Sequence, residues 1–244
     1  MNTHDPVSEV VFSIQFPQIA GMTVLDVCAF YDRLKDQFPT VQHAPRLPPI
    51  PATPTPAQPF VTYGAVLEFP RTWLISSDTH RLVQLQDDRF SFNWRRMGAG
   101  EYPGYEKLKH EFASVFEQVA DWYAAKFGGQ RLVPTLCELH YQNQIPLRDA
   151  KGEKRLFEVF AFQKEIKRKI GGFNASWIEP PSEEGQGYTA ISAAAGATPD
   201  GVPVAILNLS AITPVPAETV PSSWFEVGHT RALDIFRSLI VQGS

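Results

Sequence analysis

The chain has 244 residues, 43% of them hydrophobic, and a formal net charge of −4. This acidic balance argues against nucleic-acid binding through bulk charge, because phosphate neutralisation requires a basic surface. Two cysteines are too few for a disulfide framework, and no apolar run approaches the roughly 20 residues that span a bilayer. The N-terminus has no signal-like segment, so we expect a cytoplasmic globular protein without membrane contact.

The chain opens with a predicted strand and a predicted helix. Residues 9–16 alternate apolar and polar side chains, which is typical of a half-buried strand. In the following segment, 23–38, Thr23 and Asp26 have the spacing of a capping box and indicate a helix start.

A proline-rich segment follows over residues 39–59, with seven prolines between Pro45 and Pro59. Proline fixes φ and removes a hydrogen-bond donor, so neither a helix nor a central strand fits this segment. We expect a polyproline-like connection. It is interpreted as a semi-rigid tether across the surface, with a docking peptide for a proline-binding module as the alternative.

The next stretch predicts an antiparallel meander of four strands. Asp87 and Asp88 form a tight turn between the last two strands, since aspartate tolerates unusual turn geometry. The expected strands cover residues 61–69, 72–77, 81–86 and 89–95. Residues 102–127 then carry apolar and aromatic side chains at helical spacing and end at Gly128-Gly129, which predicts a long helix packed against the sheet.

The second half repeats this order with weaker patterns. Alternation predicts a strand over 136–145, and a helix is expected over 153–170. A final helix over 222–240 is expected to start with Ser223 and Glu226 in a second capping box. Between these helices the expected strands are 175–179, 188–196 and 202–212, the last two joined by a turn at Pro199-Asp200-Gly201.

The order of elements indicates an internal duplication. Residues 1–130 read as a first β-α-β4-α unit that includes the 39–59 connection, and residues 131–244 read as a second β-α-β3-α unit. We expect one globular α+β domain in which both units share a curved antiparallel sheet with helices on one face. That order is similar to the TATA-binding-protein saddle, but a fold does not transfer function.

Strand alternation also predicts which side chains turn away from the helices. Phe90, Phe92 and Trp94 are expected in the core, and their polar neighbours on the opposite face. Long amide side chains have little strand preference, so several of them at outward positions favour a binding surface; a plain solvated face is the alternative. The candidate binding residues are Gln84, Gln86, Asn93, Arg95, Glu138, His140 and Gln142.

Catalytic and metal-binding patterns are weak. No nucleophile elbow, P-loop or dinucleotide fingerprint occurs, so we assign no catalytic residue and expect no cofactor. Cys137 and His140 fall on opposite faces of one strand, which argues against a shared metal. Glu138 and His140 share a face and could form an acid–base pair. The basic segment 164–169 reads as a solvated helix face or a contact for an acidic partner.

Four sequence motifs in order resemble a sporadically distributed family of bacterial proteins. They are PVSEVVFSIQF, LVQLQDDRFSFNWRR, YPGYEKLKHEF and ELHYQNQI. The resemblance would cover residues 6–240 and implies a stand-alone bacterial protein, without implying an activity or site residues. Sporadic distribution is typical of horizontally transferred genes, including defence and toxin–antitoxin genes.

These observations favour a non-catalytic binding or regulatory protein that engages a protein partner, or a small-molecule ligand, through the polar sheet face. One alternative is an enzyme with a dispersed site near Glu138 and His140. Another is nucleic-acid binding through Arg95, Arg96 and the basic segment, which the acidic charge makes the weakest of the three.

Overall fold

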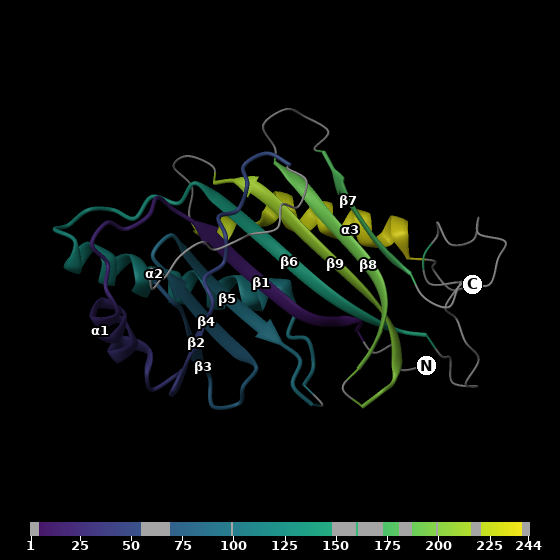
Figure 1. Ribbon diagram of the computed structural model, residues 1–244, viewed down its shortest axis with the longest axis horizontal. Coiled ribbons are helices and arrows are strands. Elements are labelled where there is room, and N and C mark those ends of the chain that lie inside the picture. The colour runs from purple at the N-terminus through teal and green to yellow at the C-terminus, as the bar shows by residue number, and fades with distance from the viewer. Residues whose placement is uncertain are drawn as a thin grey trace.

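The computed structural model describes residues 5–54, 69–98, 100–147, 160, 173–180, 187–198, 200–215 and 221–240. These residues form an α+β fold with one antiparallel sheet of nine strands and three α-helices (Figure 1). The helices are α1 (Val24–Leu34), α2 (Tyr105–Lys126) and α3 (Glu226–Leu239). The strands are β1 (Val7–Gln15), β2 (Thr40–Ala44), β3 (Arg71–Ile75), β4 (Arg81–Gln86), β5 (Arg89–Arg95), β6 (Leu136–Pro146), β7 (Asn174–Glu179), β8 (Tyr188–Ala197) and β9 (Pro203–Pro214).

The strands lie in the order β2-β3-β4-β5-β1-β6-β9-β8-β7, and every neighbouring pair is antiparallel. The first strand of the chain, β1, pairs with both β5 and β6 at the centre of the sheet. The two parts of the chain on either side of residue 130 are therefore joined by main-chain hydrogen bonds along β1 and β6.

The helices cover one face of the sheet, as α2 and α3 lie behind the strands in Figure 1. The core fills the space between. Phe12 on β1 is fully buried, and its ring centroid lies 5.7 Å from that of Phe112 on α2 and 5.0 Å from that of Phe225 beside α3. Phe90, Phe92 and Trp94 are buried in the same cluster, which confirms the side predicted for them.

The N-terminal capping motif of α1 is present as predicted. The Asp26 carboxylate accepts hydrogen bonds from the Thr23 backbone N–H at 2.7 Å and from its hydroxyl at 2.8 Å. Lys126 at the end of α2 forms an ion pair with the same carboxylate at 2.8 Å. Hydrogen bonding from Lys126 and Thr23 lowers the pKa of Asp26.

One prediction differs from the structure, and two others fall mostly on residues that the structure does not describe. The start of the 39–59 connection is a strand, β2, which among the described strands pairs with β3 alone and lies at the end of the strand order. It ends at Ala44, before the first proline of the run, because proline cannot take part in the ladder. The strand expected over 61–69 and the helix expected over 153–170 lie outside the described residues, apart from Phe69 and from Phe160, which forms a bridge with Ile240.

The capping box predicted at Ser223 and Glu226 is wrong. Pro221–Ser223 form a 3-10 turn, and α3 begins at Glu226 with Phe225 as its N-cap. The Glu226 carboxylate instead accepts a hydrogen bond from Lys109 of α2 at 2.5 Å. Within the described residues, no helix is long and apolar enough to cross a membrane.

Candidate binding face of the sheet

The seven candidate residues lie on β4, β5 and β6, and those in the strand interiors turn away from the helices. We call this side of the sheet the polar face; it is turned toward the viewer in Figure 1. Gln84 and Gln86 alternate on β4 with Val83 and Leu85, which belong to the core beneath the helices. The side predicted for these residues is therefore confirmed, but Gln84, Gln86 and Asn93 are buried and not open to solvent, whereas the other four are partly exposed.

Gln84 and Asn93 belong to the buried group, with exposed fractions of 7% and 3%. Gln84 Nε2 donates to the side-chain Oδ1 of Asn93 at 2.7 Å, and Asn93 Nδ2 donates to Glu9 Oε1 at 2.8 Å. Both side chains are thus part of a hydrogen-bonded row across β4, β5 and β1. Buried amides that bond to one another in this way rigidify a sheet and are shielded from a ligand, although Gln84 Oε1 has no partner within the described residues.

Gln86 is also buried, and its partner is a distant part of the chain. Residues 45–54, which we call the strap, cross the polar face on the side opposite α2 and α3 (Figure 1). The Gln86 side chain donates to the Leu47 carbonyl oxygen at 3.1 Å and accepts from the Leu47 N–H at 3.1 Å. Gln15 on β1 binds the N–H and the carbonyl of Ile50 in the same two-sided way.

The spacing of these contacts matches a polyproline-like backbone. Gln86 and Gln15 both pair with Arg89, from either side, so the two amides stand two strands apart, about 9.6 Å. Leu47 and Ile50 are three residues apart, and three polyproline residues advance about 9.3 Å. Arg89 fills the position between them and donates to the Pro48 carbonyl oxygen at 2.6 Å.

Beyond Ile50 the strap reaches the second half of the sheet. Ile50 is buried against an apolar patch on the polar face. The Tyr188 hydroxyl on β8 then donates to the Pro51 carbonyl oxygen at 2.9 Å. The patch consists of Leu136, Tyr188 and Ile212, from β6, β8 and β9. The strap therefore runs across the strands from β4 to β8.

The strap is anchored at its start by the Asp87-Asp88 turn, which the structure places as predicted between β4 and β5. The Arg46 guanidinium forms ion pairs with both carboxylates, which are buried. The Asp87 carboxylate also accepts a hydrogen bond from Gln18 at 2.6 Å. A buried pair of carboxylates requires a cation, and Arg46 supplies it in a forked geometry.

The second group of candidates is partly exposed and lies on β6. Gln142 pairs in register with Asn208 of β9, whose amide donates to the Ser192 hydroxyl of β8 at 3.0 Å. His140 Nδ1 lies 2.7 Å from the Ser210 hydroxyl. Gln142, Asn208 and Ser192 form a row across β6, β9 and β8, which we call the second polar row. Arg95 lies at the end of β5 and donates to the Thr79 carbonyl oxygen at 3.1 Å.

Glu138 and His140, the possible acid–base pair, are not hydrogen-bonded to each other: His140 bonds Ser210, and Glu138 pairs in register with Ile212 of β9. Cys137 is on the helix side, where its Sγ lies 2.9 Å from Thr213 Oγ1, and burial raises the pKa of its thiol to about 11. This confirms that Cys137 and His140 face opposite ways. No group of three metal-binding side chains occurs within the described part of the chain.

Each arginine of the nucleic-acid alternative donates to a main-chain carbonyl, and its basic segment lies outside the described residues. Arg95 donates to Thr79, and Arg96 donates to the Asp5 carbonyl oxygen at 2.8 Å. The segment 164–169 is outside the described residues.

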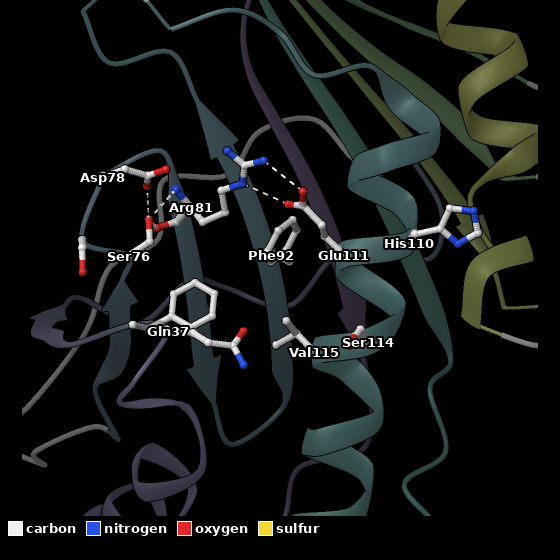
Figure 2. A pocket seen from close by; sticks show the side chains of 11 residues that line it. Gln37, Ser76, Asp78, Arg81, Phe92, His110, Glu111, Ser114 and Val115 are labelled. Atoms are coloured by element: carbon white, nitrogen blue, oxygen red, sulfur yellow. Dashed lines mark hydrogen bonds and ion pairs between the residues drawn. The ribbon is translucent and has the colours of Figure 1, made fainter.

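A cavity of about 660 Å³ lies on the helix side, between the β3–β4 turn, α2 and the end of α1 (Figure 2). Arg81 points to Glu111 and donates two hydrogen bonds to its carboxylate, at 2.9 and 3.0 Å, whereas His110 points away from this pair (Figure 2). Sequence reasoning missed the cavity. The sequence feature that indicates this cavity is Arg81, because it places a charged residue on the side of β4 that faces the helices.

No protein-family model matches the chain, and no curated protein is similar to it in sequence. The resemblance to a bacterial family therefore stays an expectation.

Proposed function

We propose that this protein is a non-catalytic binding protein whose polar face engages an extended, proline-containing segment of a protein partner. The observation that supports this proposal is the strap. The face already holds one such segment of its own chain, through side-chain amides that bind its N–H and carbonyl groups at polyproline spacing. Recognition of extended proline-rich segments uses their low conformational entropy, which reduces the cost of ordering them.

The second polar row is the surface on which we place the partner. Gln142, Asn208 and Ser192 follow one another across three neighbouring strands and are partly exposed. An extended segment that crosses these strands parallel to the strap would meet two carboxamides and one hydroxyl. Arg95 and His140 lie beside this row and would contact the ends of the segment or its side chains.

We also propose that the sheet arose from two related units, residues 1–130 and 131–244, in a saddle similar to that of the TATA-binding protein. The strand order supports it: β2-β3-β4-β5-β1 is followed by β6-β9-β8-β7, so the opening strand of each unit lies at the centre. In both units the last strand of the sheet pairs with the opening strand. In this arrangement the second unit has its own part of the polar face, and the second polar row lies on that part.

The proposal is tested with an array of immobilised proline-rich decapeptides that includes PRLPPIPATP, residues 45–54 of this chain. We expect the wild-type protein to retain a subset of these peptides, and to lose them when their prolines are replaced with alanine. The Gln142→Ala/Asn208→Ala variant should bind the retained peptides about tenfold more weakly, since each lost hydrogen bond contributes about 0.5–1.5 kcal/mol.

The matched control is Gln37→Ala/Gln118→Ala, which removes two amides on the helix side of the molecule and should leave peptide binding unchanged. Equal binding by the two double variants would show that the second polar row is not the site. A wild-type protein that retains no proline-rich peptide would contradict the proposal as a whole.

A further inference from the structure

A second cavity, of about 610 Å³, lies on the helix side of the sheet and is separate from the polar face. It is bounded by the start of β1, by β6 and β9, and by the ends of α2 and α3 that meet there. Its volume falls in the range of cavities that hold small molecules. The side chains that decide its chemistry are Tyr102, Tyr105, Tyr141, Asn143, His229 and Phe236.

The cavity wall contains a fixed stack of aromatic rings. The His229 ring lies parallel to the Tyr105 ring, with centroids 3.6 Å apart and an interplanar angle of 5°. The Tyr141 hydroxyl lies 2.8 Å from His229 Nδ1, which holds the imidazole in place from β6. A wall of this kind is flat and rigid, and it suits a flat ligand that stacks or packs edge-on against it.

Apart from the exposed carboxylate of Asp5, which also lines the cavity, the wall is uncharged at neutral pH. Burial raises the pKa of Tyr102 to about 12 and raises that of Tyr105 and Tyr141, and it lowers the pKa of His229. Lys109 stands beside the stack, and its Nζ lies 5.2 Å from the centroid of the Tyr105 ring. That charge is compensated by Glu106 at 2.7 Å and Glu226 at 2.5 Å. An anionic ligand would thus enter without a counter-charge and beside the carboxylate of Asp5.

The same wall has an unused hydrogen-bonding group. The buried hydroxyl of Tyr105 has no partner within the described parts of the chain. Asn143 lines the cavity, is 3% exposed and donates through Nδ2 to the Leu207 carbonyl oxygen at 3.2 Å. A buried polar group without a partner costs free energy, which a ligand group could recover.

We propose that this cavity binds a flat aromatic molecule that carries no negative charge and has a carboxamide, carbonyl or hydroxyl group. Its ring would lie against the Tyr105–His229 stack and Phe236, and its polar group would reach Asn143 and the tyrosine hydroxyls. This site is independent of the binding of peptides on the polar face, because the sheet separates the two.

The probes are naphthamide and naphthoate, which have the same ring system and nearly the same shape but differ in charge. Saturation-transfer NMR and calorimetric titration of the full-length protein should show binding of naphthamide. They should show naphthoate binding at least about tenfold more weakly, because burial of an unpaired carboxylate is costly.

Two variants of α3 locate the site. Leu233, which is 36% exposed, lines the cavity, so Leu233→Trp should reduce naphthamide affinity about tenfold. Val227 is 52% exposed on the same helix and does not line the cavity, so Val227→Trp should bind like the wild type. Absence of naphthamide binding, equal affinity for both probes, or equal affinity of both variants would each overturn the proposal. Far-UV circular dichroism of each variant confirms that it is folded.

Discussion

Gly187, the residue before β8, shows how one position can fix the contact between a loop and the sheet. Its φ is +79°, and a Cβ placed there would lie 1.8 Å from the Ile212 carbonyl oxygen of β9. A side chain is therefore excluded both by backbone conformation and by a main-chain atom that cannot move without disturbing the β8–β9 ladder. Strain and overlap of this kind belong to the short set of mechanisms that cause large losses of stability.

We predict that Gly187→Ala lowers the free energy of unfolding by about 3 kcal/mol. Gly21 is the control: its φ is +75° but nothing lies within 4 Å of a Cβ there, so Gly21→Ala should cost only about 1 kcal/mol. Urea unfolding measures both. If the two variants lose the same stability, the close approach to Ile212 does not matter.

The residue scale also shows what alternation can and cannot predict. The pattern Val83-Gln84-Leu85-Gln86 places each side chain on the correct face, because successive strand residues point to opposite sides. It does not predict that Gln86 is 1% exposed. That burial comes with contacts to Leu47, 39 positions away, and a local pattern contains no information about a contact of that range.

At the scale of elements, the proline-rich segment is the clearest case. Its composition predicts a polyproline-like chain, which agrees with the contact spacing along the strap. What composition does not predict is where the strap lies. Its position follows from Arg46, which meets the Asp87-Asp88 turn, and from the spacing of Gln86 and Gln15 across the sheet. The two aspartates, which read as turn residues, therefore also anchor Arg46, which is 41 and 42 positions away from them in sequence.

We predict that Arg46→Met lowers the free energy of unfolding by about 3 kcal/mol, because it leaves two buried carboxylates without a cation. Replacement of the exposed Arg33 by methionine is the control and should change stability by less than about 0.5 kcal/mol. Chemical denaturation measures the difference. Equal stability of the two variants would mean that the Asp87-Asp88 turn does not need Arg46.

At the scale of the whole molecule, the order of predicted elements was sufficient for an antiparallel sheet with helices, because each strand shows its alternation locally. The central pairing of β1 with β6 was not predictable in the same way. It joins positions such as Phe12 and Leu139, and many other strand orders satisfy the same alternation. Packing in the core favours the observed strand order, because the aromatic rings around Phe12 come from both parts of the chain.

This shared core predicts that the two parts unfold together. Phe12 is fully buried between Phe112 before residue 130 and Phe225 after it, so Phe12→Ala should cost about 3–5 kcal/mol and shift one common transition. Phe127 is half-buried and its ring contacts are with Trp122 and Tyr123 of its own helix, so Phe127→Ala should cost much less. Far-UV circular dichroism and tryptophan fluorescence should give coincident midpoints in all three proteins. Two separate transitions, of which Phe12→Ala shifts only one, would show that the parts are independent, since a core that both build cannot be lost by one alone.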